Sequence, residues 1–524
     1  MTPALPETLA ARAPVYGRRA TVVSGHSAAT LAGIATFKRG GNIVDAMVAA
    51  SAALATVVGQ ATSIGGDCFL LFHDGKTGRT TGLNASGVAP QAAAPDKFPE
   101  GMKIHGPLAP VVPGLVRAWD VMHRRRGRLA WARLFDDAIA IAEGFPVSHS
   151  LAERAPATRA QLASDSGCAA LYLPDGRPIA AGDVLRQPAL AATLRSIAAQ
   201  GADAFYHGEI AQRIGAFFER SGGLMRASDL AGYEPLWVDP VSTDYRGHYV
   251  EAMPPNSYGL LLLMQLNALA GLDAETLMAD PGRRAGFQMS ALKASVEHGR
   301  RFIADPAAVP DAVARLLAPD MTATLQEAVR APATSERVRN NGGTACLLIA
   351  DDEGNAVSLV QSVFNVFGAC LLDPETGILF NNRMQGFTHR PGEPNSVGSG
   401  RRPAHTLCPV LVHRDGKLRF VLGTPGGISQ TLTIVQVLNH LIDGGKDVAA
   451  AVDAPRWCNT RGGDFLIEPA FPDDAVATLA MMGHKARIAE DPYFYGSAKA
   501  IEIMPTGALA GAGDRHREAA ALGV

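Results

Sequence analysis

The stretch Asn341-Gly342-Gly343-Thr344-Ala345-Cys346-Leu347-Leu348-Ile349-Ala350 places two glycines and a threonine directly before an apolar run. The run over 344–350 predicts a buried β-strand that begins at the threonine. A flexible Gly-Gly segment would let the Thr344 hydroxyl attack the preceding carbonyl and cut the chain. The new α-amine, with a reference pKa of about 7.7–8.0, could then act as the base for that hydroxyl. The same pattern is also typical of an ordinary turn.

A second glycine pair occurs in Gly423-Thr424-Pro425-Gly426-Gly427. Because glycine lets the backbone come close to a ligand, the amides of Gly426 and Gly427 could donate hydrogen bonds to a developing oxyanion. Taken alone, Pro-Gly-Gly is also typical of a plain loop. The two segments together give the hypothesis of a threonine nucleophile with an oxyanion hole.

Hydrophobic periodicity divides the chain into a helix-rich first part and a strand-rich second part. The first part predicts two helices within 26–58 that are broken at 39–42, strands at 68–72 and 80–85, and mostly helices over 113–330. The second part predicts strands at 344–350, 356–362, 377–381, 407–412 and 418–422, a helix at 429–442 and a strand at 498–504. This mixture fits a layered α/β or α+β body.

Composition excludes several classes of partner. The 524 residues include 48 Lys plus Arg and 50 Asp plus Glu, whereas a nucleic-acid binder should carry a basic surplus. The longest apolar runs, 46–58 and 260–272, are shorter than the roughly 20 residues of a membrane-spanning helix. The N-terminal segment Met1–Glu7 lacks the pattern of a secretory signal, so we expect a cytoplasmic protein without nucleic-acid or membrane partners.

Common catalytic and metal signatures are also missing. The sequence has no Gly-x-Ser-x-Gly elbow and no His-Glu-x-x-His motif. Its six cysteines are far apart, with no Cys-x-x-Cys pair and no histidine at metal-binding spacing, so we expect buried thiols, no metal and no cofactor.

Several short motifs along nearly the whole chain make a family resemblance specific. They are Gly40-Gly41-Asn42-Ile43-Val44-Asp45-Ala46, Ser63-Ile64-Gly65-Gly66, Pro113-Gly114-Leu115-Val116, Ala204-Phe205-Tyr206-His207-Gly208-Glu209, Asp229-Leu230-Ala231-Gly232-Tyr233, Tyr245-Arg246-Gly247, Asp352-Glu353-Gly354-Asn355-Ala356-Val357-Ser358 and Ala454-Pro455-Arg456. With them, the sequence resembles the gamma-glutamyltransferase (glutathione hydrolase) family of N-terminal nucleophile hydrolases.

The resemblance implies a fold and a set of catalytic residues. The fold would be α+β, a four-layer αββα sandwich whose central sheets draw strands from both halves. Self-cleavage would give a large subunit, 1–343, and a small subunit, 344–524, which together form a heterodimer. By similarity Thr344 is the nucleophile, Gly426 and Gly427 form the oxyanion hole, and the Ser362 hydroxyl hydrogen-bonds the nucleophile.

The positions that hold glutamate in the family differ here. Ser86 stands in place of the arginine that binds the α-carboxylate, and His405-Thr406 in place of a serine pair. The positions that bind the α-amino group read Phe364, Arg383 and Gly386, with Asn365 adjacent. Arg383 would repel an ammonium and favour an anion as its counter-ion. Alternatively, Arg383 pairs with a carboxylate of the protein, His405 is a core histidine, and Phe364 packs rather than binds.

The resemblance therefore implies a self-processing amidohydrolase or acyltransferase that acts on a small-molecule amide. Its substrates would be gamma-glutamyl or related small acyl amides, although the altered positions predict that gamma-glutamyl compounds are poor substrates. Three alternatives remain open: an oxamate-type amidohydrolase acting on a small anionic amide, an acylase acting on side-chain amides, and an inactive processed scaffold. The intact Thr344 and glycine pair argue against the scaffold.

Overall fold

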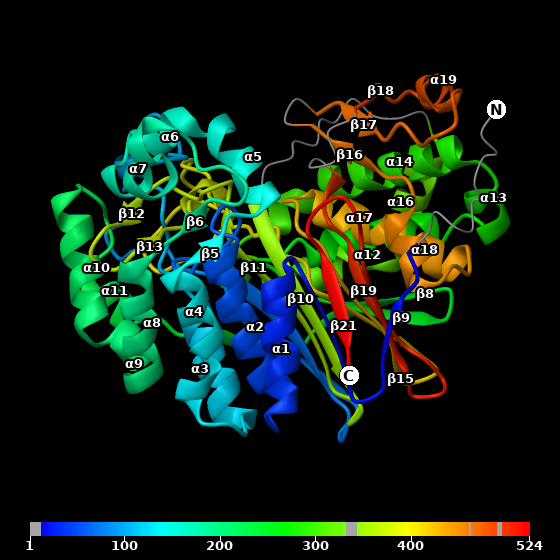
Figure 1. Ribbon diagram of the computed structural model, residues 1–524. Helices are drawn as coiled ribbons and strands as arrows, with labels where there is room; N and C mark the ends of the chain where they lie inside the picture. Colours follow the sequence, from blue (N-terminus) through cyan, green and yellow to red (C-terminus); the bar gives the residue numbers. More distant parts are fainter. Residues whose placement is uncertain (1–11, 332–342, 461–462, 490–494) are drawn as a thin grey trace, which may run out of the picture.

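Two antiparallel seven-stranded sheets that pack face to face form the centre of the protein (Figure 1). The computed structural model describes residues 12–331, 343–460, 463–489 and 495–524. The segment Met1–Glu7 and the residues Asn341 and Gly342, on which part of the sequence analysis rests, lie outside the described residues. Side chains such as Phe69, Leu348 and Val421 fill the space between the sheets.

The first sheet contains Thr344. Its strand order is β21-β2-β10-β11-β3-β4-β7, with the bounds β21 Ala520–Gly523, β2 Ala20–Ser24, β10 Gly343–Asp351, β11 Ala356–Phe364, β3 Asp67–Asp74, β4 Arg79–Ala85 and β7 Leu236–Val238. β10 and β11 are buried at every position, because both faces of this sheet are covered at its centre.

The second sheet has the order β1-β20-β19-β15-β14-β9-β8. Its strands are β1 Val15–Gly17, β20 Leu509–Gly513, β19 Lys499–Ile503, β15 Lys417–Gly423, β14 Val410–Arg414, β9 His248–Ala252 and β8 Val241–Tyr245. Both sheets thus combine strands from before and after Thr344, as expected.

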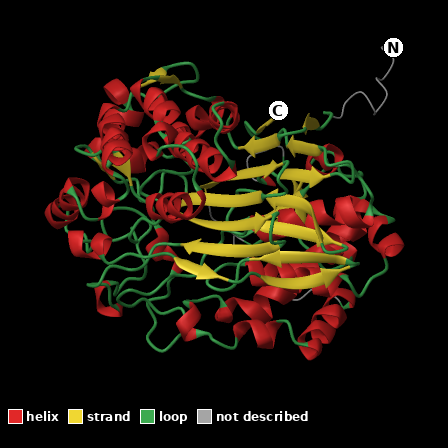
Figure 2. Cartoon of the chain, turned by 90° about the horizontal axis from the view of Figure 1, so that it is seen from below, coloured by secondary structure: helices red, strands yellow, loops and turns green. Residues whose placement is uncertain are grey.

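Helices cover the outer face of each sheet and complete four layers, αββα (Figure 1). The first sheet is covered by α1 Ser27–Lys38, α2 Ile43–Val57 and α3 Leu115–Arg126, and α4 Asp136–Glu143 packs on α2. The second is covered by α12 Gly259–Leu269, α17 Ser429–Leu438 and α18 Val448–Asp453, and α14 Pro281–Gly299 and α16 Pro319–Arg330 pack on α12. Figure 2 shows the strands gathered at the centre with helices around them.

Smaller elements surround this body. A helical lobe beside the sheets comprises α5 His149–Ala157, α6 Arg159–Ala163, α7 Ser166–Tyr172, α8 Pro188–Gln200, α9 Asp203–Tyr206, α10 Glu209–Arg220 and α11 Ala227–Ala231. The other short helices and strands are α13 Ala274–Met278, α15 Ala312–Leu316, α19 Ala475–Met481, β5 Phe145–Pro146, β6 Val184–Leu185, β12 Leu372–Asp373, β13 Ile378–Leu379, β16 Trp457–Asn459, β17 Phe465–Ile467 and β18 Ala486–Ile488. Within the described residues, no helix combines the length and apolar character that a membrane crossing requires.

Most expected elements are confirmed with small shifts of their ends, including the mostly helical region 113–330, and the structure adds detail at two places. The region 113–330 also contains β7, β8 and β9, short strands with partly exposed side chains that give little apolar alternation. The helix expected over 429–442 ends at Leu438 and continues as the π-helical turn Asn439–Asp443.

The junction between α1 and α2 is held by a capping box. The Asn42 side chain accepts hydrogen bonds from the backbone amides of Val44 and Asp45, and the Asp45 carboxylate accepts one from the Asn42 amide. The same carboxylate also accepts hydrogen bonds from the amides of Arg128 and Leu129 at 3.0 and 3.1 Å. These bonds connect the segment that follows α3 to the start of α2.

Replacing Asp45 with alanine should therefore destabilise the fold. Asp45→Ala leaves three partly buried amides without their acceptor, so we expect the free energy of unfolding in urea to fall by about 1–3 kcal/mol. As the matched control, Asp136→Ala removes an exposed carboxylate in the first turn of α4 and should change stability by about 0.5 kcal/mol or less. Equal effects of the two substitutions would contradict the capping role.

Candidate active site

Thr344 lies at an irregularity in the pairing of β10 with β11. Gly343 is opposite Phe364, whereas Ala345 is opposite Gln361, so Ser362 and Val363 of β11 both oppose Thr344 and form a bulge in β11. A bulge changes the direction of a side chain relative to the regular alternation of a strand. The position of the Ser362 side chain relative to Thr344 is thus set by the register of the two central strands.

Two hydroxyl groups meet at the carbonyl oxygen of Gly343. Thr344 Oγ1 and Ser362 Oγ each donate a hydrogen bond to this oxygen at 2.7 Å, and the two hydroxyl oxygens are 3.3 Å apart. The Phe364 amide donates to Ser362 Oγ at 2.7 Å and holds this hydroxyl in place. All three groups are buried. The structure therefore brings together the expected nucleophile, its expected partner and the peptide bond that would be cut.

The glycine pair lies at the start of α17. Gly426 and Gly427 have φ angles of +131° and +61°, which side chains with a Cβ rarely adopt. Pro425, the residue before them, borders a cavity of about 30 Å³ that Thr344, Ser497 and Lys499 also border. The loop that carries the glycine pair therefore reaches the surroundings of the nucleophile, and the pair's role as an oxyanion hole stays a prediction.

Beside Ser362 lies a fully buried cluster of charged and polar side chains. Asp67, at the start of β3, is the strand partner of Ser362. Its carboxylate is 2.8 Å from His405 Nε2 and 3.4 Å from Arg383 Nη2. The ring of Phe364 covers the Arg383 guanidinium, with 4.2 Å between Cζ and the ring centroid.

The charges of this cluster compensate each other. Burial pushes the pKa of Asp67 upward, but the Arg383 charge and the contact with His405 outweigh it and lower that pKa below its usual value. Burial and the nearby Arg383 charge lower the pKa of His405 to about 4, so this imidazole is neutral at neutral pH. The cluster then consists of one anion, one cation and one neutral ring.

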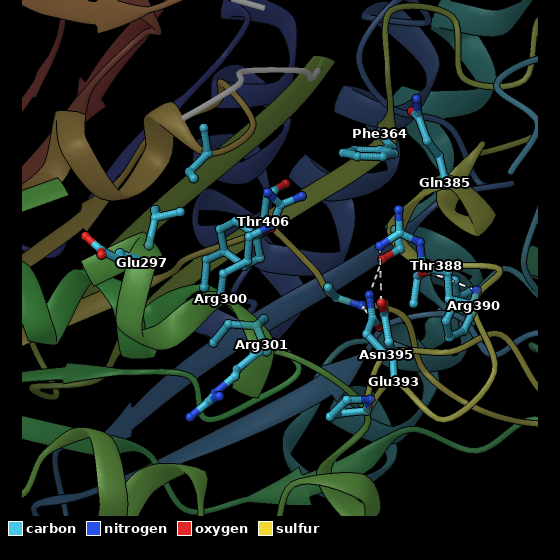
Figure 3. Close-up of a pocket in the computed structure, with 18 residues that line it drawn as sticks. Glu297, Arg300, Arg301, Phe364, Gln385, Thr388, Arg390, Glu393, Asn395 and Thr406 are labelled. Atoms are coloured by element: carbon cyan, nitrogen blue, oxygen red, sulfur yellow. Dashed lines mark hydrogen bonds and ion pairs between the residues drawn. The ribbon is translucent and has the colours of Figure 1, made fainter. Parts of the chain in front are cut away.

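A large cavity of about 920 Å³ opens next to these residues (Figure 3). Its wall includes Phe364, Thr406 and Ile428, which are close in sequence to Ser362, His405 and Gly427. Further parts of the wall come from the start of α12, from the end of α14 with the residues that follow it, and from the segment 385–404. These are Tyr258, Val296, Glu297, Arg300, Arg301, Ile303, Gln385, Gly386, Phe387, Thr388, Arg390, Glu393, Pro394, Asn395 and Ala404.

The residues expected to bind substrate divide into two groups. Thr406 borders the large cavity, and the Asn365 side chain donates to Gln385 Oε1 on its wall. Ser86, Arg383 and His405 are fully buried behind the wall instead. Ser86 donates to Asn84 Oδ1 and accepts from Asn256 Nδ2. Of the two interpretations of Arg383, pairing with a carboxylate of the protein agrees with its contact to Asp67. Contact of Arg383 with substrate stays a prediction.

Sequence reasoning missed Asp67, Tyr258 and Arg300. Asp67 had a usable signal, since a carboxylate directly before the apolar run Cys68–Phe72 is costly unless it is paired. Tyr258 and Arg300 belong to helical segments whose pattern does not indicate that they border one cavity. Among the described residues no cluster of His, Cys, Asp and Glu could hold a metal ion, and none of the six cysteines, all buried, is in a disulfide.

Comparison with known proteins identifies the family. The family model described as gamma-glutamyltranspeptidase matches residues 29–524. The glutathione hydrolase-like YwrD proenzyme of Bacillus subtilis (strain 168) is 33% identical over 523 residues, which cover 97% of this chain and 99% of that protein. This chain belongs to the gamma-glutamyltranspeptidase family.

Other members of the family support both the fold and enzymatic activity. The glutathione hydrolase proenzyme of Escherichia coli (strain K12) and the acylase ACY 1 proenzyme of Pseudomonas sp. (strain V22) are each 32% identical, with 96% and 95% of this chain and 91% and 92% of those proteins covered. The crystal structure of cephalosporin acylase from Bacillus halodurans has a TM-score of 0.91 at 31% identity and covers 100% of this chain and 98% of that one. The N-terminal nucleophile hydrolase fold and a gamma-glutamyltranspeptidase-like amidohydrolase activity are thereby confirmed.

In this family member the Asp67–Arg383 pair can be tested by a double-mutant cycle. Asp67→Ala leaves the buried guanidinium uncompensated and should lower the free energy of unfolding by about 3–5 kcal/mol. Adding Arg383→Met removes that charge, so the double variant should recover at least half of the loss in urea unfolding. Strictly additive losses would contradict the compensation of charge.

Proposed function

We propose that this chain is a self-processing amidohydrolase in which Thr344 is the nucleophile, first toward its own chain and then toward substrate. The observation that carries the proposal is the pair of 2.7 Å hydrogen bonds from Thr344 Oγ1 and Ser362 Oγ to the Gly343 carbonyl oxygen. A hydroxyl nucleophile therefore lies beside the peptide group that it would attack. A second hydroxyl is in place to stabilise negative charge on the same oxygen.

The cleavage would proceed through an ester. Thr344 Oγ1 attacks the carbonyl carbon of Gly343, the bond from that carbon to the Thr344 nitrogen breaks, and the hydroxyl proton is transferred to the nitrogen. Water then hydrolyses the ester, which releases the Gly343 carboxylate and restores the hydroxyl. Thr344 is left with a free α-amine. The fragments 1–343 and 344–524 would stay together as a heterodimer because both sheets combine strands from each fragment.

In the mature enzyme the α-amine of Thr344 would act as general base. It accepts the hydroxyl proton as Oγ1 attacks a substrate amide, and it returns the proton to the amine that leaves. The amides of Gly426 and Gly427 would donate to the oxyanion. Water then hydrolyses the acyl-enzyme and completes the reaction.

The cavity favours an acyl amide of considerable size as substrate. Its volume of about 920 Å³ is near the upper end of the roughly 300–1,000 Å³ of sites that enclose drug-sized ligands. This volume and the similarity to acylases support a side-chain acylase over an oxamate-type enzyme. Gamma-glutamyl amides remain the weaker candidate, because Ser86, Arg383 and His405 are engaged with other buried groups.

The nucleophile assignment predicts the processing of three variants. The purified wild-type chain should yield fragments 1–343 and 344–524 without added protease, as read by intact-mass spectrometry. Thr344→Ala should remain one chain of 524 residues, and Thr344→Ser, which keeps a hydroxyl, should still be cleaved. Ser362→Ala should slow cleavage by about 10²-fold, the scale of losing one oxyanion donor. Cleavage at the same bond in Thr344→Ala would exclude Thr344.

The glycine pair predicts a second result. Gly427→Val places a β-branched residue at a φ of +61° and should lower the turnover of folded, cleaved enzyme by about 10²-fold or more. Gly445→Val is the matched control, because Gly445 has a φ of +62° and open space around it. The control should keep wild-type turnover while showing a similar loss of stability. Near-normal turnover of Gly427→Val would remove the pair from the mechanism.

A further inference from the structure

Two arginines of the large cavity's wall, Arg300 and Arg301, have no carboxylate within 4.0 Å among the described residues, and Arg300 has no ring contact either. Among the cavity's described wall residues, Arg390 is 3.6 Å from the Glu393 carboxylate, and the Arg301 guanidinium lies 4.8 Å from the ring centroid of Phe302. The cavity therefore contains a cation that is available to a ligand.

Two residues with hydroxyl groups, Tyr258 and Thr406, border the cavity together with Arg300. The Arg300 charge acts on the Tyr258 hydroxyl, whose pKa burial raises, so the phenol stays a hydrogen-bond donor at neutral pH. The Tyr258 amide donates to the carbonyl oxygen of His405, the residue before Thr406. Figure 3 shows Arg300 and Thr406 on one side of the cavity, with Phe364 and Gln385 across from them.

Arg383, in contrast to Arg300, is not accessible to a ligand in the cavity. Arg383 is fully buried, contacts the Asp67 carboxylate and is covered by the Phe364 ring, which itself borders the cavity. An anion in the cavity would meet the ring of Phe364 before it could reach this guanidinium. It can reach Arg300 directly.

We infer that Arg300, together with the hydroxyls of Tyr258 and Thr406, is a carboxylate receptor, so that the substrate is an amide with a carboxylate remote from the bond that is cut. A guanidinium forms strong, directional hydrogen bonds to a carboxylate, and two neighbouring hydroxyl donors add to the selectivity. The catalytic consequence rests on the proposed function of Thr344, whereas binding of the carboxylate does not.

The test compares amides that differ in one charge. The glutaryl and pentanoyl anilides differ in the end of the acyl chain, carboxylate against methyl, and 4-(pentanoylamino)benzoate carries the carboxylate on the amine half instead. Arg300→Met should lower the preference in kcat/KM for a carboxylate-bearing amide over the neutral one at least tenfold, through KM. Arg301→Met, the neighbouring arginine at the same helix end, should keep the wild-type preference. Whichever charged amide responds identifies the half that carries the carboxylate.

A binding measurement separates this inference from the proposed mechanism. Calorimetry with glutarate on the Thr344→Ala chain needs no cleavage and no turnover. Arg300→Met in that background should weaken binding at least tenfold, and Arg301→Met should not. The assignment of Arg300 as the carboxylate receptor would be overturned if Arg300→Met left both glutarate binding and the charge preference unchanged. It would also be overturned if Arg300→Met and Arg301→Met had equal effects. Failure of wild-type cleavage with intact, Arg300-dependent glutarate binding would overturn only the nucleophile assignment.

Discussion

The bulge between β10 and β11 is the constraint on which the site depends. In a regular strand pair, side chains alternate strictly between the two faces, and the direction of Ser362 on β11 would follow from that alternation alone. The extra residue instead accompanies a geometry in which the hydroxyls of Thr344 and Ser362 both contact the Gly343 carbonyl. The burial of both central strands between helices and the second sheet fixes their register.

The buried cluster next to this carbonyl shows how the fold tolerates charge at its centre. Asp67 and Arg383 compensate each other, and burial keeps His405 neutral, so the interior beside Ser362 carries no net charge. The Phe364 ring separates this cluster from the cavity, and its backbone has a φ of +80°, which is uncommon for a bulky residue. Arg300 borders the cavity, whereas Arg383 is buried behind Phe364.

Much of this architecture could be predicted from local pattern. The apolar runs around Thr344, the break between α1 and α2, and the hairpin turns at Asp74–Gly78 and Arg414–Lys417 each carry their signal within a few residues. The surroundings of the pocket could not be predicted in this way, because they depend on contacts between distant segments. The sequence around Arg383 gives no sign of a partner for its charge. The partner, Asp67, is at the start of β3, 316 residues earlier in the chain, and is identified only by the fold. Arg300 gave no signal, since a cation at a helix end is usually solvated.

Each sheet contains strands from before and after Thr344, and this affects whether the protein can refold after the proposed cleavage. While the chain is continuous, folding is a unimolecular reaction. Once the bond is cut, β10, β11 and β21 belong to one polypeptide and β2, β3 and β4 to another, although they remain hydrogen-bonded neighbours. A mature molecule that unfolds would need an encounter between two partners to recover, at a rate that depends on their concentration. Its working lifetime would then be set by the height of the unfolding barrier rather than by an equilibrium between folded and unfolded forms.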